Sequence, residues 1–260
     1  MNPSLDDIKE LARGAGQILR EGYERDFTVQ HKGRIDLVTD VDHRSEAYLL
    51  GQIQGRFPGH TIVTEESGHL AGADDSCWYI DPLDGTVNFA HGVPVFSVSI
   101  AFAQNGIVQL GVVYDPMRDE LFSAERGRGA RLNDKRIHVS PANELLQSLL
   151  TTGFSYQEWI IDHNLAHYQR FAHLTQGVRR LGSAAIDLCY VAAGRFDGYW
   201  EISLQPYDIA AGGLIVEEAG GIMTATYGDS DYLRAPCSVL AANPALHAQM
   251  LAVLLESRPV

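Results

Sequence analysis

The sequence predicts an α+β protein that becomes α/β in its second half, and three observations lead to this prediction. Apolar residues dominate 95–103 and 107–114, with QNG between them, which is a β-hairpin signal. Helix-like stretches come before this hairpin. After SPANELLQS, strand-like and helix-like segments alternate to the end of the chain, as in an α/β layer. We therefore expect an α+β part over residues 1–140 and an α/β part over residues 141–260.

The first part is expected to begin with two helices. Ser4 and Asp7 have capping-box spacing, and apolar residues then recur at helical intervals to Leu19. The second helix is expected over 42–56, before FPG. HTIVTEES and CWYIDPLDGT each read as a strand ending in acids. After the hairpin, LFSAE and GRGARLNDKRIHVS predict more antiparallel strand.

The second part is expected to alternate regularly. LLTTGF reads as a strand, residues 156–174 as a helix, and RRLGSAAIDLCYVAAG as a loop feeding a helix. FDGYWEI predicts a strand. QPYDIAAGGLIVEEAGG predicts a helix with proline at its start and glycines at its end. SVLAAN and PALHAQMLAVLL predict a final strand and helix.

Composition narrows the classes of function. The 260 residues carry 20 Lys and Arg against 33 Asp and Glu, a net charge of −13. This charge argues against nucleic acid or a membrane as the main partner and fits a protein that gathers cations. Three scattered cysteines without a CxxC pair indicate a reduced, cytoplasmic compartment. The start does not resemble a signal peptide, and VPVFSVSIAFA is too short to span a bilayer.

Acidic residues recur where predicted strands end or predicted helices begin. They are Asp42, Glu65, Glu66, Asp81, Asp84 and Asp208. Hard divalent cations such as Mg²⁺ prefer carboxylate and carbonyl oxygens, so a cluster of these acids would suit such an ion. In DPLDGT, Pro82 helps to turn the chain so that both carboxylates can converge, and Gly85 permits close approach to a ligand. The N–H groups of Gly85 and Thr86 would then be available to phosphate oxygens.

Each of these acids also has an ordinary explanation. DPLDG alone is typical of a turn, Glu65 and Glu66 of a solvated pair, and Asp208 of an acid that complements a helix dipole. Their repetition at four separate junctions favours a common site. His163 and His167 have zinc-like spacing without the glutamate of HExxH, so we expect surface histidines.

WYIDPLDGTVNF, preceded by TEES and followed by QPYDIAAGGLIVEEAGG, resembles the inositol monophosphatase family. The likeness runs from KGRIDLVTDVD to VLAAN and is closest to bacterial inositol-1-monophosphatases. It implies a layered αβαβα sandwich and a Mg²⁺-dependent, lithium-sensitive phosphatase that forms a homodimer. Val87 and Tyr207 depart from common family residues, which leaves substrate preference open.

The resemblance also implies roles for individual residues. The metal ligands for two to three Mg²⁺ ions would be Glu65, Asp81, the Leu83 carbonyl, Asp84 and Asp208. Thr86, Asp42 and Glu65 would be catalytic. The substrate contacts would be Leu83, Asp84, Gly85, Thr86, Arg179, Gly182, Ser183, Ala184, Glu201 and Asp208. Lys32 would lie in a loop that closes over the metals.

The expected reaction is hydrolysis of a phosphate monoester, with myo-inositol 1-phosphate as the first candidate substrate. Fructose 1,6-bisphosphate, histidinol phosphate and 3′-phosphoadenosine 5′-phosphate remain alternatives within the same family. A different kind of function, interaction with the transcription machinery, is also open because some bacterial relatives have it.

Overall fold

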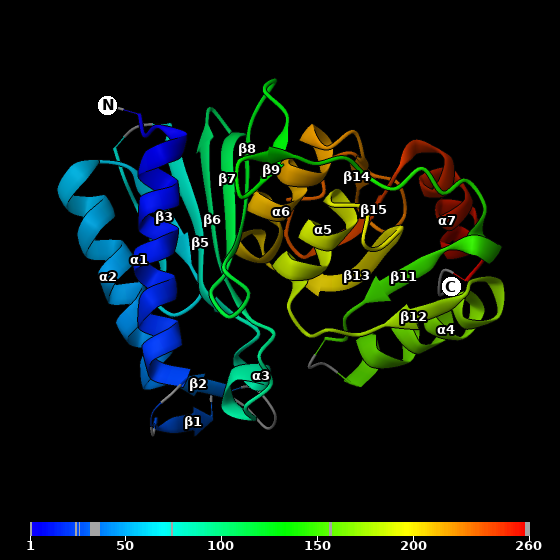
Figure 1. Ribbon diagram of the computed structural model, residues 1–260, viewed down its shortest axis with the longest axis horizontal. Coiled ribbons are helices and arrows are strands. Elements are labelled where there is room, and N and C mark those ends of the chain that lie inside the picture. Colours follow the sequence, from blue (N-terminus) through cyan, green and yellow to red (C-terminus); the bar gives the residue numbers. More distant parts are fainter. Residues whose placement is uncertain are drawn as a thin grey trace.

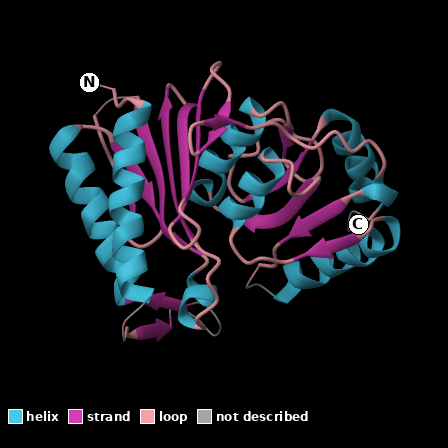
Figure 2. Cartoon of the chain, viewed as in Figure 1, coloured by secondary structure: helices cyan, strands magenta, loops and turns pink. Residues whose placement is uncertain are grey.

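The computed structural model describes residues 2–23, 25, 27–31, 37–73, 75–155 and 158–257. Lys32 lies outside these residues, so the expectation for it remains a prediction. Helices and sheets alternate in layers across the molecule, as Figures 1 and 2 show. This is the predicted αβαβα layered sandwich, and the predicted fold class is confirmed.

The first helical layer covers the outer face of the larger sheet. It consists of α1 (Leu5–Tyr23) and α2 (Asp40–Arg56), which lie side by side in Figure 1. Thr39 and Asp42 form a capping box at the start of α2, so this helix begins slightly before the predicted residue. A small antiparallel pair, β1 (Val29–His31) and β2 (Leu37–Thr39), lies near the end of α1.

The larger sheet has eight strands in the order β10-β9-β8-β7-β6-β5-β3-β4. Only the β3–β5 pairing is parallel among these strands. The predicted hairpin is confirmed as β6 and β7, which pair antiparallel. The bounds are β3 Thr61–Thr64, β4 Gly68–Leu70, β5 Ser76–Asp84, β6 Ser97–Gln104, β7 Ile107–Asp115, β8 Glu120–Glu125, β9 Ala130–Leu132 and β10 Lys135–Arg136.

The smaller sheet has five strands in the order β12-β11-β13-β15-β14. β11 pairs in parallel with both β12 and β13, whereas β15 pairs antiparallel with β13 and β14. The bounds are β11 Leu149–Thr152, β12 Gly177–Arg179, β13 Gly198–Leu204, β14 Ile222–Thr224 and β15 Cys237–Ala242.

The remaining helices complete the layers. Between the sheets lie α5 (Ala184–Ala192) and α6 (Pro206–Glu218), while α4 (Glu158–Leu174) and α7 (Pro244–Glu256) cover the outer face of the smaller sheet. Two short elements, α3 (Thr86–Ala90) and η1 (Leu145–Gln147), connect the main ones. None of the described helices combines the length and apolarity that a membrane span requires.

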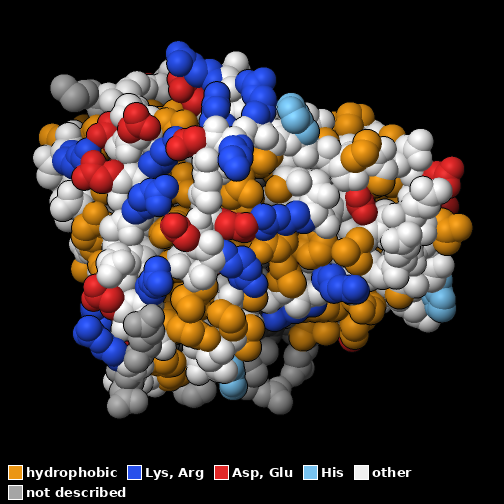
Figure 3. Space-filling model, in the orientation of Figure 1, with side chains coloured by type: hydrophobic (Ala, Val, Ile, Leu, Met, Phe, Trp, Pro, Cys, Tyr) orange, Lys and Arg blue, Asp and Glu red, His pale blue; other side chains and the backbone are white. Residues whose placement is uncertain are grey.

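One hydrophobic cluster joins the two halves of the chain. Phe122 and Ala101 from the larger sheet are buried in the same cluster as Leu214 of α6 and Val239 of the smaller sheet. Separate clusters lie under α1 and α2 and under α7. On the surface shown in Figure 3, acidic and basic side chains are interspersed. The continuous core holds the two sheets in a fixed relation, which matters because the residues described next come from both.

The expectation of surface histidines is wrong for His167. This side chain is 0% exposed on α4 and packs against the ring of Tyr227. His163 instead packs against Trp159 near the start of α4. The spacing of four residues therefore does not create a shared metal site.

Candidate active site

A cavity of about 450 Å³ opens where strands of both sheets end and where α3, α5 and α6 begin. Most of the predicted site residues line it. The lining comprises Glu65, Asp81, Leu83, Asp84, Gly85, Thr86, Gly153, Phe154, Ser155, Arg180, Gly182, Ser183, Ala184, Asp187, Glu201, Ser203, Leu204, Gln205, Tyr207 and Asp208.

An irregularity in β5 places two acids on the same cavity. Asp81 pairs with Ser99 and Asp84 with Ser97, so one more residue lies between the pairs on β5 than on β6. Pro82 and Leu83 form this bulge, and the Leu83 N–H donates to Asp81 Oδ1 over 3.0 Å. Both acids of DPLDGT therefore line one cavity, at a bulge near the end of a strand.

The carboxyl group of Asp84 is held by the start of α5. The backbone N–H groups of Ala184 and Ala185 donate to it over 3.2 and 2.9 Å, and the Ser183 hydroxyl also donates. Ser97 adds a long contact of 3.4 Å from β6. Because N–H groups at a helix start carry partial positive charge, they stabilise the ionised form of this acid.

Thr86 and Asp42 form a second connected unit. The Thr86 hydroxyl lies 3.1 Å from Asp42 Oδ1 and 3.0 Å from the Leu83 carbonyl oxygen. Asp42 does not itself line the cavity. It is fully buried behind Thr86, where Thr39 donates to its other oxygen. The capping box of α2 therefore also fixes the acid that faces Thr86.

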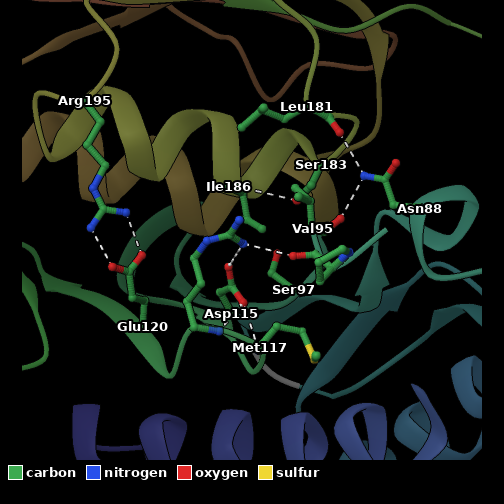
Figure 4. A network of polar contacts seen from close by, with 12 residues as sticks. Asn88, Val95, Ser97, Asp115, Met117, Glu120, Leu181, Ser183, Ile186 and Arg195 are labelled. Carbon is green, nitrogen blue, oxygen red and sulfur yellow. Dashed lines mark hydrogen bonds and ion pairs between the residues drawn. The ribbon is translucent and has the colours of Figure 1, made fainter. Parts of the chain in front are cut away.

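Gly85 permits the chain to turn tightly between β5 and α3. Its φ is +99°, which is the left-handed region where residues with side chains are strained. A Cβ here would lie 3.0 Å from the Val95 carbonyl oxygen and 3.3 Å from that of Gly182. Asn88 of α3 bridges the same two segments, donating to the carbonyls of Val95 and Leu181 over 2.8 Å each (Figure 4).

Asp208 comes from the second half of the chain. It lies in the first turn of α6, where its Oδ2 accepts from the Gln205 N–H over 2.7 Å. Pro206 occupies the first turn of the same helix and presets its φ. The expected dipole complementarity is thus present, and the same side chain also faces the cavity.

The four acids Glu65, Asp81, Asp84 and Asp208 place concentrated negative charge in this cavity. Burial raises the pKa of Asp81 well above its usual value, and the neighbouring charges of Glu65 and Asp84 raise it further. Burial, opposed by its hydrogen bonds, raises the pKa of Asp84. Burial raises the pKa of Asp208 well above its usual value, and the charges of Asp84 and Glu65 raise it further. The hydrogen bond from the Gln205 N–H opposes this rise. Such a set is unfavourable when fully ionised unless positive charge lies between its members.

These oxygens suit a hard divalent cation, since carboxylate and carbonyl groups are its preferred ligands. Among the described residues, no three His, Cys, Asp or Glu side chains already surround one point. Hydrogen bonds to Asp84 and Asp208 direct carboxyl oxygens of these side chains toward the helix starts. The donor set fits a divalent cation, which Glu65, Asp81, the Leu83 carbonyl, Asp84 and Asp208 would hold.

The inner wall of the cavity carries two further buried acids. Glu201 on β13 accepts a hydrogen bond from Tyr199, and its carboxyl packs so closely on Gly153 that any Cβ there would collide with it. Asp187 on α5 accepts from Thr151 over 2.7 Å. Burial raises the pKa of Glu201 to about 7 and raises that of Asp187 well above its usual value.

The structure separates one predicted substrate contact from the cavity. Arg179 is not among the lining residues, whereas its neighbour Arg180 is, with its guanidinium lying against Gly182. The sequence reasoning also did not find Asp187, Thr151 or the Gly153–Ser155 segment. The one available signal was an acid in the first turn after GSAA, and such an acid usually complements the helix dipole.

Fold and cavity together define a layered αβαβα protein with an acid-lined cavity between two sheets. The chain matches the inositol monophosphatase family over residues 3–258, and it belongs to that family. It is 49% identical over 249 residues to an inositol-1-monophosphatase of Synechocystis, covering 95% of this chain and 86% of that protein. It is 47% identical over 246 residues to the Nus factor SuhB of Pasteurella multocida, covering 93% and 92%. The solved inositol monophosphatase of Anabaena superposes with a TM-score of 0.87 at 43% identity, covering 98% and 96%.

Proposed function

We propose that this protein is a Mg²⁺-dependent phosphatase that hydrolyses a phosphate monoester, with myo-inositol 1-phosphate as its first candidate substrate. The observation that carries the proposal is the cavity in which Glu65, Asp81, Asp84 and Asp208 meet. Family membership supports it, as does the name of the Synechocystis relative.

The oxygen donors form two overlapping groups of possible metal ligands, which share Asp81. Glu65, Asp81 and the Leu83 carbonyl would hold one ion, and Asp81, Asp84 and Asp208 a second. A third ion could bind near Glu65, which would give the upper limit of the predicted two to three Mg²⁺ ions. When bound, the cations supply positive charge that lowers the pKa of water and neutralises charge on the phosphate oxygens.

Thr86 and Asp42 would position the attacking water. Asp42 accepts the hydrogen of the Thr86 hydroxyl, which leaves the Thr86 oxygen able to accept a hydrogen from water. The pair comes from two elements, α3 and α2, and the capping box of α2 holds its buried member in place. No side-chain nucleophile is needed, since phosphoryl transfer depends mainly on positioning and electrostatic stabilisation.

The two parts of the chain would contribute different functions. Residues 1–140 would supply Asp42, Glu65, Asp81, Asp84 and Thr86. Residues 141–260 would supply Asp208 and the substrate contacts at Gly182, Ser183, Ala184 and Glu201, all of which face the same cavity. Arg180 is a better candidate than Arg179 for a cation on the substrate side, because Arg180 lines the cavity.

The direct test is phosphate release from myo-inositol 1-phosphate by the purified protein with and without Mg²⁺, and then with Li⁺ added. We expect release that requires Mg²⁺ and falls when Li⁺ is present. Parallel assays of fructose 1,6-bisphosphate, histidinol phosphate and 3′-phosphoadenosine 5′-phosphate rank the alternatives. Mg²⁺-independent release, or none from any of the four, would contradict the proposal.

Two accompanying proposals rest on the same membership and on composition. The first is a homodimer, which sedimentation of the purified protein tests. The second is a cytoplasmic location, which fits the three free cysteines and which fractionation of cells tests.

A second candidate function is binding to the transcription machinery. Several relatives, including that of Pasteurella multocida, are named Nus factor SuhB. A pull-down from cell extract with the wild type and with Asp84→Asn separates the two functions. Equal recovery of transcription proteins by both would support a role independent of catalysis, and recovery of none by either would remove this candidate.

A further inference from the structure

Two buried residues with hydroxyl groups, Thr151 and Tyr199, support the inner wall of the cavity. Thr151 on β11 and Tyr199 on β13 are direct partners in the parallel pairing of these strands. Neighbouring strands lie about 5 Å apart, and paired residues direct their side chains to the same face. The two side chains therefore point to the same face of the smaller sheet.

Each hydroxyl holds one carboxyl group. Tyr199 donates to Glu201, two residues further along the same strand, and Thr151 donates to Oδ1 of Asp187 over 2.7 Å. Among the described residues, these are the only hydrogen bonds that the two carboxyl groups accept. Both acids line the cavity, although Asp187 is 1% and Glu201 8% exposed.

An acid buried in this way without full hydrogen bonding is unfavourable, since a carboxyl group has room for several donors. The remaining acceptor capacity of both groups therefore suits a ligand that brings hydroxyl groups into the cavity. Arg180 is the only cationic side chain among the described lining residues, and its charge acts to lower the pKa of both carboxyl groups, although no ion pair joins it to either acid among the described residues. This wall is thus built for hydrogen-bond donors.

We propose that Asp187 is a specificity-determining residue that accepts a hydrogen bond from a substrate hydroxyl beside the one that Glu201 receives. Thr151 positions it by occupying Oδ1, and the pairing of Thr151 with Tyr199 ties both acids to one face of the smaller sheet. The proposal rests on the proposed phosphatase function and adds a second hydroxyl contact to it. It predicts preference for a phosphate ester with hydroxyl groups on adjacent carbons.

The experiment compares myo-inositol 1-phosphate with cyclohexyl phosphate, which has the same ring without hydroxyl groups. Asp187→Asn keeps the size of the side chain and replaces one carboxyl oxygen with an N–H donor group. We expect kcat/KM for the inositol ester to fall about tenfold, mainly through KM, because the contact is present in substrate and transition state alike. We expect the value for cyclohexyl phosphate to stay as in the wild type. Thr151→Val should lower the ratio of kcat/KM for the inositol ester to kcat/KM for cyclohexyl phosphate by a smaller factor.

Asp197→Asn is the matched control. Asp197 accepts from the Leu149 N–H over 2.6 Å between the same two strands, but it does not line the cavity. This variant should keep the wild-type ratio of the two esters. If the ratio of kcat/KM for the two esters in Asp187→Asn stayed as in the wild type, with or without equal losses on both esters, the role of Asp187 would be overturned. If Asp187→Asn does not fold, an unchanged ratio in Thr151→Val overturns it instead. A wild type that hydrolyses neither ester would overturn this proposal, and only a wild type that also hydrolyses none of the three alternative esters would overturn the phosphatase function itself.

Discussion

The two walls of the cavity hold their acids in different ways. On the wall formed by β5 and the starts of α5 and α6, backbone N–H groups donate to Asp81, Asp84 and Asp208. On the inner wall, Glu201 and Asp187 each rest on a single hydroxyl group. In the first arrangement, main-chain N–H groups fix negatively charged side chains in place, and this concentration of charge calls for cations. The second leaves acceptor capacity for a ligand, so the walls separate charge neutralisation from recognition.

The largest effect is expected from Asp84→Asn on the first wall. This change removes one charge from the proposed metal site while leaving a side chain of the same size. We expect kcat/KM to fall by about 1000-fold on both inositol 1-phosphate and cyclohexyl phosphate. Steady-state assays at saturating Mg²⁺ measure this, and circular dichroism checks that the fold is retained. Near-normal turnover in a folded variant would remove Asp84 from the site.

Thr86→Ala should have the next largest effect. The alanine cannot hold a water molecule in line with phosphorus, and Asp42 loses the hydroxyl that it faces at 3.1 Å. We expect kcat to fall by about 100-fold with little change in KM. Thr86→Ser keeps the hydroxyl and should recover most of the activity. A serine variant as impaired as the alanine variant would show that the hydroxyl is not what matters.

Two acids of the first wall, Asp81 and Asp84, were open to prediction because they lie in a short contiguous motif. Asp81, Asp84 and Gly85 fall within five residues, and their convergence depends on a local bulge. The order of strands and helices was also predictable, since apolar patterning reports which elements are buried. The hairpin of β6 and β7 is one example.

The inner wall was not predictable in the same way. Asp187 is held at the cavity by a hydrogen bond from Thr151, which lies 36 residues earlier in the chain and on another element. Arg179 and Arg180 are neighbours of the same residue type, and only the structure shows that Arg180 lines the cavity and Arg179 does not. His167 was predicted at the surface because nothing in the local pattern reports that α4 turns it inward.

The unfavourable charge on the first wall can be measured through Asp81, as a change in the free energy of unfolding with pH. Its pKa is raised in the folded state, so the folded protein binds this proton more tightly than the unfolded chain does. Its contribution is therefore present at low pH and is lost as pH rises through the folded pKa. A tenfold difference in proton affinity between the two states corresponds to about 1.4 kcal/mol of stability. We expect the metal-free protein to lose stability as pH rises, and Asp81→Asn to reduce this loss.

Thermal melts of the chelator-treated protein between pH 5 and pH 8 provide the measurement. Mg²⁺ should raise the melting temperature of the wild type and should raise that of Asp81→Asn less, since binding to the folded state alone stabilises it. The Asp197→Asn variant should follow the wild type in both respects. If Asp81→Asn and the wild type showed the same pH dependence without metal, the first wall would not carry the unfavourable charge inferred for it.

Glu201 gives the smallest effect and the sharpest contrast with the first wall. Burial raises its pKa to about 7, so the free enzyme should lose this proton as pH rises from 6 to 8. An ionised carboxylate accepts a stronger hydrogen bond than a neutral acid. We therefore expect KM for inositol 1-phosphate to fall about threefold to tenfold over this range. Cyclohexyl phosphate, which has no hydroxyl to donate, corrects for the ionisation of the phosphate itself.

Glu201→Gln should remove this pH dependence and leave kcat for cyclohexyl phosphate intact, because the amide does not titrate. Cations bound on the first wall would lower the pKa of Glu201, so the midpoint should move down as Mg²⁺ increases. That movement would show electrostatic coupling between walls that hold their acids by different means. A KM ratio that stays flat with pH in the wild type would mean that Glu201 meets no substrate hydroxyl. The inner wall would then serve the fold rather than recognition.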